Sequence, residues 1–117
     1  MLPKINRIRK RKDFEKIFKN SKSVKNKLLI FRIIKNNLRL NRFGFIVSQK
    51  VSKKATIRNK IRRRLSESIK LEKDIIKNGT DLVIIALPGI ENEKFLGIKN
   101  AIHDNLIKAE LIARLKA

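Results

Sequence analysis

The strongest hydrophobic pattern in the chain is a four-residue repeat in its middle, formed by Ile57, Ile61, Leu65 and Ile69. Residues four apart lie on one face of an α-helix, so the repeat predicts an amphipathic helix from about Thr56 to Lys77. The Asn78-Gly79 pair supplies a C-terminal stop. Polar and basic residues point away from this apolar stripe, namely Asn59, Lys60, Arg62, Arg63 and Ser66, and its flanks are Arg58 and Arg64.

Two further helices are predicted by similar spacing. A short helix follows Asp13 and ends near Asn20-Ser21, with apolar residues at Phe14, Ile17 and Phe18. Its two phenylalanines are either core residues or, for one of them, a platform on which a nucleic-acid base stacks, and the pattern does not choose between these roles. A last helix from about Asn92 has one apolar face, made of Phe95, Ile98, Ile102, Leu106, Ala109 and Ala113.

Three segments have the composition of β-strands. Residues 28–34 are bulky and β-branched, residues 42–51 alternate, and residues 82–87 form a continuous apolar run typical of a buried central strand. The polar residues 36–41 predict a hairpin between the first two strands. The predicted order is α-β-β-α-β-α, with room for a short extra strand, which indicates an α+β fold with helices packed on a small mixed sheet.

The alternating segment 42–51 separates two sets of side chains. One set is apolar and is expected in the core: Phe43, Phe45, Val47 and Val51. The other set is Arg42, Gly44, Ser48 and Lys50, with Ile46 as the one large apolar exception. This second face is either a shallow polar groove or the solvent side of the sheet, and the pattern slightly favours the solvent side.

The charge indicates what such a fold binds. The formal net charge is +21, and all of the excess lies in residues 1–64, where 23 lysines and arginines accompany two acids; residues 65–117 hold eight of each. Residues 4–12 form a basic arm with Ile5 and Ile8 as its only anchors. Nucleic acid is the favoured partner, because counterion release drives its binding to such a field. An anionic membrane is the weaker candidate, since the basic helix lacks bulky apolar side chains to insert.

Other chemistry finds little support. Without cysteine, disulfides and thiolate metal sites are excluded. His103 is the only histidine and the acids lack the spacing of a metal site, so neither a catalytic centre nor a protein-bound metal is predicted. No apolar run reaches the roughly 20 residues of a membrane span, and the N-terminus lacks a signal-peptide core. We expect one cytoplasmic nucleic-acid-binding domain over residues 1–117, with residues 1–12 as an arm whose composition allows flexibility, and neither a membrane nor a small molecule as partner.

The central helix contains Ala55-x-x-Arg58-Asn59-Lys60-Ile61-Arg62-Arg63-x-Leu65, which resembles the signature of the bacterial ribonuclease P protein subunit. Other segments resemble the same family: Asp13-Phe14-x-x-Ile17-Phe18-Lys19, Arg42-x-Gly44-x-x-Val47-Ser48 followed by Lys50, and Asp81-Leu82-Val83-Ile84-Ile85-Ala86. The resemblance implies a four-stranded mixed sheet packed with three helices, similar to the second domain of a small-subunit ribosomal protein. It also implies a left-handed βαβ crossover, although right-handed crossovers are the rule.

The resemblance further implies a function. Members of the family bind a large catalytic RNA that removes the 5′ leader of precursor transfer RNA with Mg²⁺, so the metal and the chemistry are expected in the RNA and this chain acts within the holoenzyme. The catalytic RNA is expected at Arg58, Asn59, Lys60, Arg62, Arg63 and Arg64. The single-stranded leader is expected between the first helix and the sheet, at Phe14, Phe18, Phe31, Ser48 and Lys50. Additional phosphate contacts are expected at Arg9, Lys10, Arg11, Lys12, Lys53 and Lys54.

Four sites depart from the residues common in that family. Gln49 stands in place of a cation, Lys53-Lys54 in place of Gly-Asn, Ser66 in place of a basic residue and Phe31 in place of a tyrosine. These departures concern local contacts and leave the central motif intact. Composition alone fits a second class equally well, a structural RNA-binding protein of the ribosomal type. A protein nuclease is disfavoured, because no acid–base or metal cluster is evident.

Overall fold

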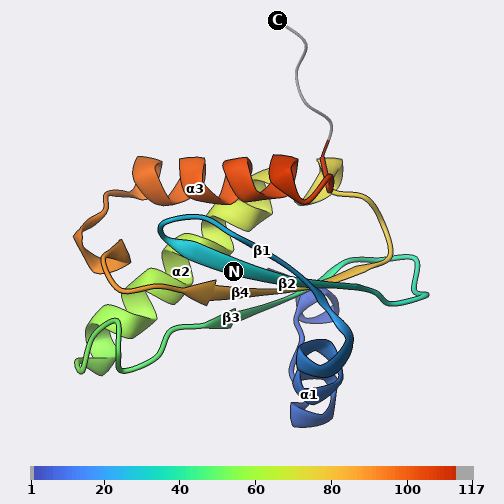
Figure 1. The fold of residues 1–117 in the computed structure, drawn as a ribbon, viewed down its shortest axis with the longest axis horizontal. Coiled ribbons are helices and arrows are strands. Elements are labelled where there is room, and N and C mark those ends of the chain that lie inside the picture. The colour runs from blue at the N-terminus through green and yellow to red at the C-terminus, as the bar shows by residue number, and fades with distance from the viewer. Residues whose placement is uncertain (1, 113–117) are drawn as a thin grey trace, which may run out of the picture.

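The computed structural model describes residues 2–112, which form a four-stranded sheet with helices on both faces (Figure 1). Its elements are η1 (Lys4–Asn6), α1 (Arg11–Asn20), β1 (Lys22–Lys25), β2 (Leu29–Lys35), β3 (Arg42–Ile46), α2 (Ala55–Glu72), η2 (Lys73–Ile75), β4 (Thr80–Ala86), η3 (Ile90–Asn92) and α3 (Phe95–Lys108). The predicted α+β class is confirmed, and β1 is the short extra strand. The predicted apolar face of the last helix includes Ala113, which lies outside the described residues.

The sheet order is β1-β2-β4-β3, with β3 parallel to β4 and the other pairs antiparallel. The predicted hairpin between β2 and β3 is wrong, because β4 lies between them. β4 is buried on both faces along most of its length, and such a strand is stabilised in the centre of a sheet. The connection 36–41 instead passes the start of β4, where Asn36 N donates to Gly79 O at 2.8 Å.

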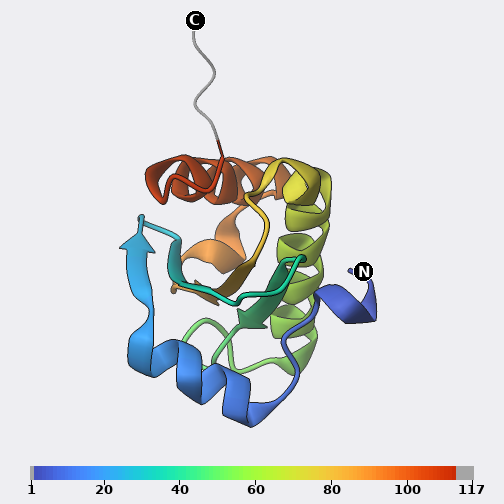
Figure 2. The same cartoon turned by 90° about the vertical axis from the view of Figure 1, so that its right-hand side faces the viewer.

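The molecule has three layers, with α2 and α3 on one face of the sheet and α1 across the other (Figure 2). The β3–α2–β4 unit connects two parallel neighbours. This crossover is left-handed (Figure 2), as the family resemblance implies. The usual rule for such units is a right-handed path, so hydrophobic periodicity alone does not predict this feature.

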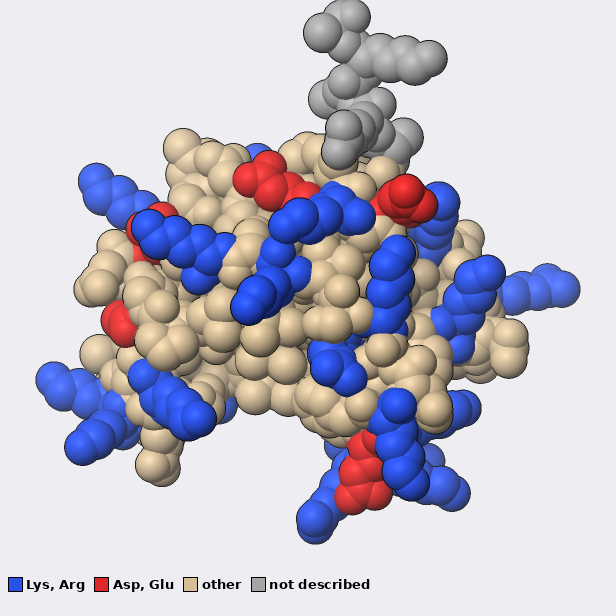
Figure 3. Space-filling view, in the orientation of Figure 1, with Lys and Arg blue, Asp and Glu red and all other residues tan. Residues whose placement is uncertain are grey.

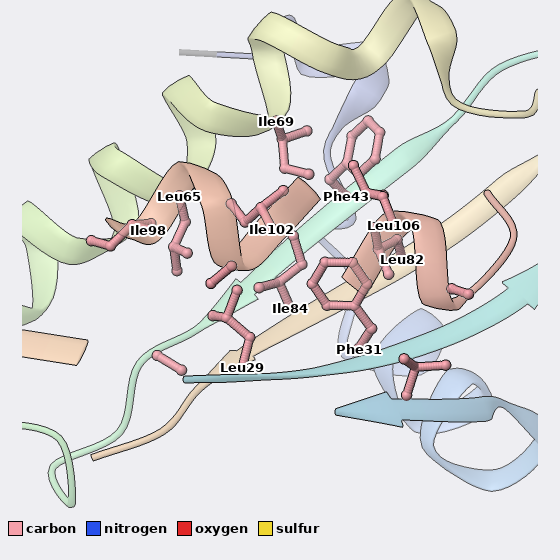
Figure 4. Packing of buried hydrophobic residues seen from close by; sticks show 14 of the residues in the cluster. Leu29, Phe31, Phe43, Leu65, Ile69, Leu82, Ile84, Ile98, Ile102 and Leu106 are labelled. Carbon is pink, nitrogen blue, oxygen red and sulfur yellow. The ribbon is translucent and has the colours of Figure 1, made fainter. Parts of the chain in front are cut away.

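The main core lies between the sheet and the layer of α2 and α3 (Figure 4). The predicted stripe of α2 is confirmed, since Ile61, Leu65 and Ile69 are buried and Ile57 packs at the margin. The inward set of the alternating segment is confirmed as well: Phe43, Val47 and Val51 are buried and Phe45 packs against them. The periodicity therefore predicts the apolar faces of the two segments correctly. β3 is nevertheless shorter than predicted, because it ends at Ile46, and Val47 and Val51 enter the core from the loop that follows.

α2 and α3 are shorter than predicted. α2 ends at Glu72, and η2 follows it, so that Ile76 enters the core from extended backbone. Gly79 does not stop a helix; its φ of 80° forms the turn into β4. α3 begins only at Phe95, because Gly89, with φ 108°, and η3 first turn the chain.

α2 also buries a wider face than its apolar stripe. The stripe places Ser66 on the outward side, which is wrong: Ser66 is buried together with Ser68 and Glu72. The physical reason is that α2 packs against both the sheet and α3. On the α3 side, Glu72 Oε1 contacts His103 Nδ1, so His103 lies at the flank of α3 and joins the two helices.

The basic N-terminal segment is attached to the edge of the sheet. Leu2 and Ile8 are buried, whereas Ile5, the other predicted anchor, is exposed. Arg7 forms a parallel bridge with Phe43, and Ile8 N donates to Phe43 O at 2.8 Å. This segment therefore covers part of the edge that β3 would otherwise leave unpaired.

α1 covers the second face of the sheet, which is thus not simply the predicted solvent side. A small apolar cluster lies beneath it, with Ile8, Ile17 and Val83 buried and Phe14, Ile34, Ile46 and Ile85 packed around them. The Phe14 ring lies over Gly44, where an added Cβ would come within 2.8 Å of Phe14 Cε1. The missing side chain of Gly44 is what permits this close approach.

A network of polar side chains holds α1 to the sheet. Arg42 of β3 donates to both carboxylate oxygens of Asp81 of β4, at 2.9 and 2.6 Å, and to Asp13 of α1 at 3.4 Å. Asn36 donates to Asp81 Oδ1 at 2.8 Å. Hydrogen bonding to Asp81 raises the pKa of Arg42 above its ordinary value. The negative charges of Asp81 and Asp13 raise this pKa further, whereas burial of the guanidinium lowers it. Three segments of the chain therefore meet at the buried carboxylate of Asp81, and α1 joins them through Arg42.

We expect Asp81→Asn to lower the free energy of unfolding by about 2–3 kcal/mol, because Arg42 loses its main counter-charge while remaining partly buried. Urea denaturation followed by circular dichroism measures the change. Glu15→Gln is the matched control, since it removes only the exposed ion pair with Arg11 on α1, which contributes little. Equal stability of the two variants would contradict the role assigned to this network.

Candidate nucleic-acid interface

The exposed side of α2 contains cations in two different states. Lys60 and Arg63 are exposed, and their side chains extend from the helix towards solvent. Arg58, Arg62 and Arg64 are half-buried, and each of them also donates a hydrogen bond to a backbone carbonyl in a neighbouring segment. The predicted catalytic-RNA residues thus lie together on one helix, but they are not equivalent.

The three half-buried arginines attach loops to α2. Arg58 Nη1 donates to the carbonyls of Ser52 and Lys53, at 3.0 and 2.9 Å, and thereby orders the loop that enters the helix. Arg62 donates to Val47 O at 3.2 Å and to Asn59 Oδ1 at 2.6 Å. A guanidinium has five N–H donors, so both side chains keep donors for a phosphate after making these bonds.

Arg64 makes the corresponding contact on the α3 side. Its Nη1 donates to Glu93 O at 3.0 Å, just before α3 begins. All three arginines donate to backbone carbonyls, which are neutral. These hydrogen bonds therefore do not cancel the positive charges of the arginines. The motif consequently presents a pre-organised cationic surface whose geometry is fixed before any ligand binds.

The loop before α2 adds polar and basic groups to this surface. Ser48, Lys50, Lys53 and Lys54 are all exposed. Lys54 stands at the N-cap position, and the first turn of α2 contains no acid. The positive end of a helix dipole attracts anions, so the start of α2 and these lysines act in the same direction. Gln49 is exposed as well and adds no charge.

α1 contributes an aromatic side chain with a cationic neighbour. Phe18 is 40% exposed, and the Arg32 guanidinium lies 5.7 Å from its ring centroid. Arg32 also donates to Phe18 O and to Ser21 Oγ, both at 2.8 Å. These bonds fix the guanidinium against the ring and so hold the exposed face of Phe18 in position.

The structure does not bring the predicted leader residues together as a set. Phe31 is fully buried in the main core, so its ring is not available for stacking, and its placement in the cleft is corrected. Successive residues of a strand point to opposite faces, and the neighbour that faces α1 is Arg32. Phe14 is half-buried over Gly44. Of the three phenylalanines, only Phe18 presents a largely accessible ring.

The sheet adds a row of apolar side chains beside α1. Ile30, Ile85 and Ile46 are register neighbours on β2, β4 and β3, and all three are half-buried. Lys25 continues the row on β1, opposite Ile30. The alternation of side chains along each strand shows which residues share a face of the sheet. This row could be predicted from that alternation only if the order of the strands were known.

The remaining predicted phosphate contacts lie at the start of α1. Arg9, Lys10, Arg11 and Lys12 are exposed, and Arg11 pairs with Glu15 at 3.2 Å. Figure 3 shows lysines and arginines gathered over α1 and over the loop that enters α2, with surface of neither charge between them. Within residues 2–112, no group of three or more His, Asp or Glu side chains could hold a metal ion, and no helix is long and apolar enough to span a membrane.

The basic helix and the aromatic–cation pair on an α+β sheet define a class, that of small proteins that bind RNA through a pre-organised cationic surface. Comparison with known proteins identifies the member of this class. The family model described as Ribonuclease P matches residues 2–110. The chain therefore belongs to the bacterial ribonuclease P protein family, which supplies the protein component of the transfer-RNA 5′ endoribonuclease.

Individual relatives cover nearly the whole chain. The ribonuclease P protein component of Alkaliphilus oremlandii is 42% identical over 108 residues, which are 92% of this chain and 94% of the relative. That of Thermoanaerobacter sp. strain X514 is 37% identical over 113 residues, 97% of each chain. The ribosomal-type alternative is thereby superseded.

Solved structures agree with the fold. The RNase P protein of Staphylococcus aureus superposes with a TM-score of 0.85 at 31% identity, covering 92% of this chain and 98% of that one. The RNase P protein from Thermotoga maritima gives 0.77 at 30% identity, covering 95% and 98%. The predicted four-stranded mixed sheet with three helices is confirmed by these similarities.

We expect Arg62→Ala and Arg63→Ala to differ in stability but not in their effect on salt dependence. Each variant should weaken binding to the cognate ribonuclease P RNA and lower the steepness of its salt dependence by about one counterion. Only Arg62→Ala should also lower the free energy of unfolding, by about 1–2 kcal/mol, because Val47 O and Asn59 lose their donor.

Filter binding across a potassium chloride series and urea denaturation provide the two measurements. Lys70→Ala, which removes an exposed cation further along α2, is the control for charge alone. An unchanged salt slope in Arg63→Ala would remove this residue from the interface, and equal stabilities would show that the Arg62 hydrogen bonds do not hold the loop.

Proposed function

We propose that α2 binds the catalytic RNA of ribonuclease P, while the sheet surface beside α1 binds the single-stranded 5′ leader of precursor transfer RNA. The observation that supports this most is the separation of two kinds of surface. α2 offers closely spaced guanidinium groups with fixed geometry, whereas α1 and the sheet offer an accessible ring and an apolar row. Folded RNA presents phosphates, and a single strand also presents unstacked bases.

The contact with the catalytic RNA is carried by charge. Lys60 and Arg63 reach phosphates directly, and Arg58, Arg62 and Arg64 use the donors that remain after their carbonyl bonds. Asn59 accepts from Arg62 and keeps an amide group for the RNA. Lys53, Lys54 and the basic residues 9–12 extend the field around this centre. Guanidinium groups bind phosphate with two parallel hydrogen bonds, which suits a rigid array on one helix.

The contact with the leader combines stacking with apolar burial. The exposed ring of Phe18 accepts the face of any base, and the Arg32 guanidinium lies 5.7 Å from the centroid of this ring. The row of Ile30, Ile85 and Ile46 offers a hydrophobic surface for the next bases along the strand. Ser48 and Lys50, both exposed in the loop between β3 and α2, provide a hydroxyl and a cation for the leader backbone. This surface selects for single strands without reading their sequence.

Mg²⁺ enters this function through the RNA. The residues that the structure describes supply no cluster of ligands for a metal, so the fit of a protein-bound Mg²⁺ is poor. We therefore place the catalytic metal on the RNA, whose phosphates provide the hard oxygen ligands that Mg²⁺ prefers. The role of the chain is to hold two RNA molecules in one assembly and to screen the repulsion between them.

Reconstitution tests the proposed function. The chain mixed with its cognate RNA should cleave precursor transfer RNA with a higher kcat/KM than the RNA alone at physiological salt, since the protein adds leader contacts and lowers repulsion. The measurement is single-turnover cleavage of 5′-labelled precursor. Mg²⁺-dependent cleavage by the RNA-free chain, or no effect of the chain on the RNA, would refute the proposal.

A second prediction distinguishes a phenylalanine of the leader surface from a phenylalanine of the core. Phe18→Ala should weaken binding of the holoenzyme to precursor transfer RNA by about 1–3 kcal/mol, the worth of one stacked base, and leave binding to mature transfer RNA unchanged. Phe31→Leu is the matched control, because it changes a buried phenylalanine of β2 and should lower stability without changing the preference for a leader.

Affinities for the two RNAs are measured by titration before cleavage becomes appreciable. A loss of affinity for both RNAs in Phe18→Ala would show that the ring supports the fold and not the leader. A changed leader preference in Phe31→Leu would mean that the core side of β2, and not the Arg32 side, determines the contact.

A further inference from the structure

A second exposed phenylalanine lies beside the basic helix. Among the six phenylalanines of the chain, four are buried or half-buried, and two are more than one-third exposed: Phe18 at 40% and Phe95 at 37%. Phe18 belongs to the proposed leader surface. Phe95 is the first residue of α3, and α3 begins on the same side of the molecule as α2 (Figure 1). Neither the core nor the leader surface explains the exposure of Phe95.

Phe95 forms one wall of a shallow hollow between α2 and the start of α3. The hollow has a volume of about 220 Å³, and the residues that line it are Lys60, Arg63, Arg64, Glu67 and Phe95. Three of these residues are cations of the proposed catalytic-RNA surface. An accessible aromatic ring therefore stands next to the groups that we expect to hold phosphates.

The backbone on both sides of Phe95 is anchored to the rest of the fold. Arg64 Nη1 donates to Glu93 O at 3.0 Å and attaches the segment before Phe95 to α2. On either side of Phe95 the chain is anchored by Ile90 and Ile98, both fully buried. An anchored backbone reduces the conformational entropy that is lost when a ligand stacks on the side chain.

The chemistry of the hollow favours a nucleotide over an apolar protein segment. An apolar partner would remove three cations and the Glu67 carboxylate from water, a lining with a net positive charge, without adding any counter-charge, which is costly. An unpaired nucleotide offers both a flat face for Phe95 and phosphates for Lys60 and Arg63. We propose that one unpaired base of the catalytic RNA stacks on Phe95, with its flanking phosphates bound by these two residues. This inference rests on the proposed function of α2.

Substitutions at Phe95 and its neighbour test the proposal. Phe95→Ala should weaken binding of the full chain to the cognate ribonuclease P RNA by about 5- to 150-fold, the range expected for one lost base stack. Phe95→Leu should lose nearly as much, and Phe95→Tyr should bind like the wild type, because the ring and not its hydrophobicity is required. Leu96→Ala is the matched control, since Leu96 is 64% exposed on the same helix and does not line the hollow.

Salt dependence distinguishes stacking from charge. Phe95 is neutral, so Phe95→Ala should lower the affinity equally at every salt concentration and leave the salt slope unchanged. A thermal melt of each variant verifies that it is folded. Wild-type affinity in Phe95→Ala, wild-type affinity in Phe95→Leu, or an equal loss in Leu96→Ala would each overturn the proposal.

Crosslinking identifies the base. With benzoylphenylalanine at position 95, irradiation of the complex should label one nucleotide in an unpaired region of the catalytic RNA. Replacing that nucleotide by an abasic residue should abolish the difference between wild type and Phe95→Ala. Crosslinks to the precursor or to a second copy of the chain would overturn the proposal. If the wild-type chain does not bind the catalytic RNA, the proposed function of α2 fails instead.

Discussion

The bidentate ion pair between Arg42 and Asp81 is the interaction on which the position of α1 depends. In a chain with a net charge of +21, carboxylates are scarce, and one of them is buried where α1, β3, β4 and the 36–41 connection meet. The pair neutralises Arg42 inside a positive field and thereby lets a basic helix lie against the sheet. Gly44 then admits the Phe14 ring. The row of Ile30, Ile85 and Ile46 stays half-buried because α1 covers only part of this face, where the Arg42 network, the Arg32 hydrogen bonds and the small apolar cluster hold it.

Hydrophobic periodicity predicted the parts of the fold that depend on one segment at a time. The stripe of α2 and the inward face of β3 follow from spacing alone, and the family motif adds the crossover and the sheet composition. The order of the strands could not be read in this way, because it depends on how β2, β3 and β4 compete for the central place. The polar connection 36–41 has the composition of a hairpin loop, yet it bridges two strands that are not neighbours.

The candidate site was predictable to the level of the helix, but not to the level of each side chain. The motif places the basic residues of α2 on one surface, as the structure shows. The leader residues were harder to predict, because adjacent residues of a strand face opposite sides of the sheet. On β2, Phe31 faces the core and the next residue, Arg32, faces α1. The carbonyl contacts of Arg58, Arg62 and Arg64 have no sequence signal, because any residue can supply their acceptors. The predicted apolar face of the last helix included Phe95, because helical spacing does not reveal that α3 begins at this residue, which is 37% exposed.

The type of acceptor separates structural arginines from arginines that remain available to RNA. Arg42 donates to two carboxylates, so its charge is compensated within the protein. Arg58, Arg62 and Arg64 donate to carbonyls and, in the case of Arg62, to an amide oxygen. These acceptors are neutral, so the bonds order the side chains without cancelling their charge. A neutral tether lowers the entropy cost of binding while preserving the field that attracts phosphate. Carboxylate tethers at the same positions would order the surface equally well, but they would remove the charge for which the surface is ordered.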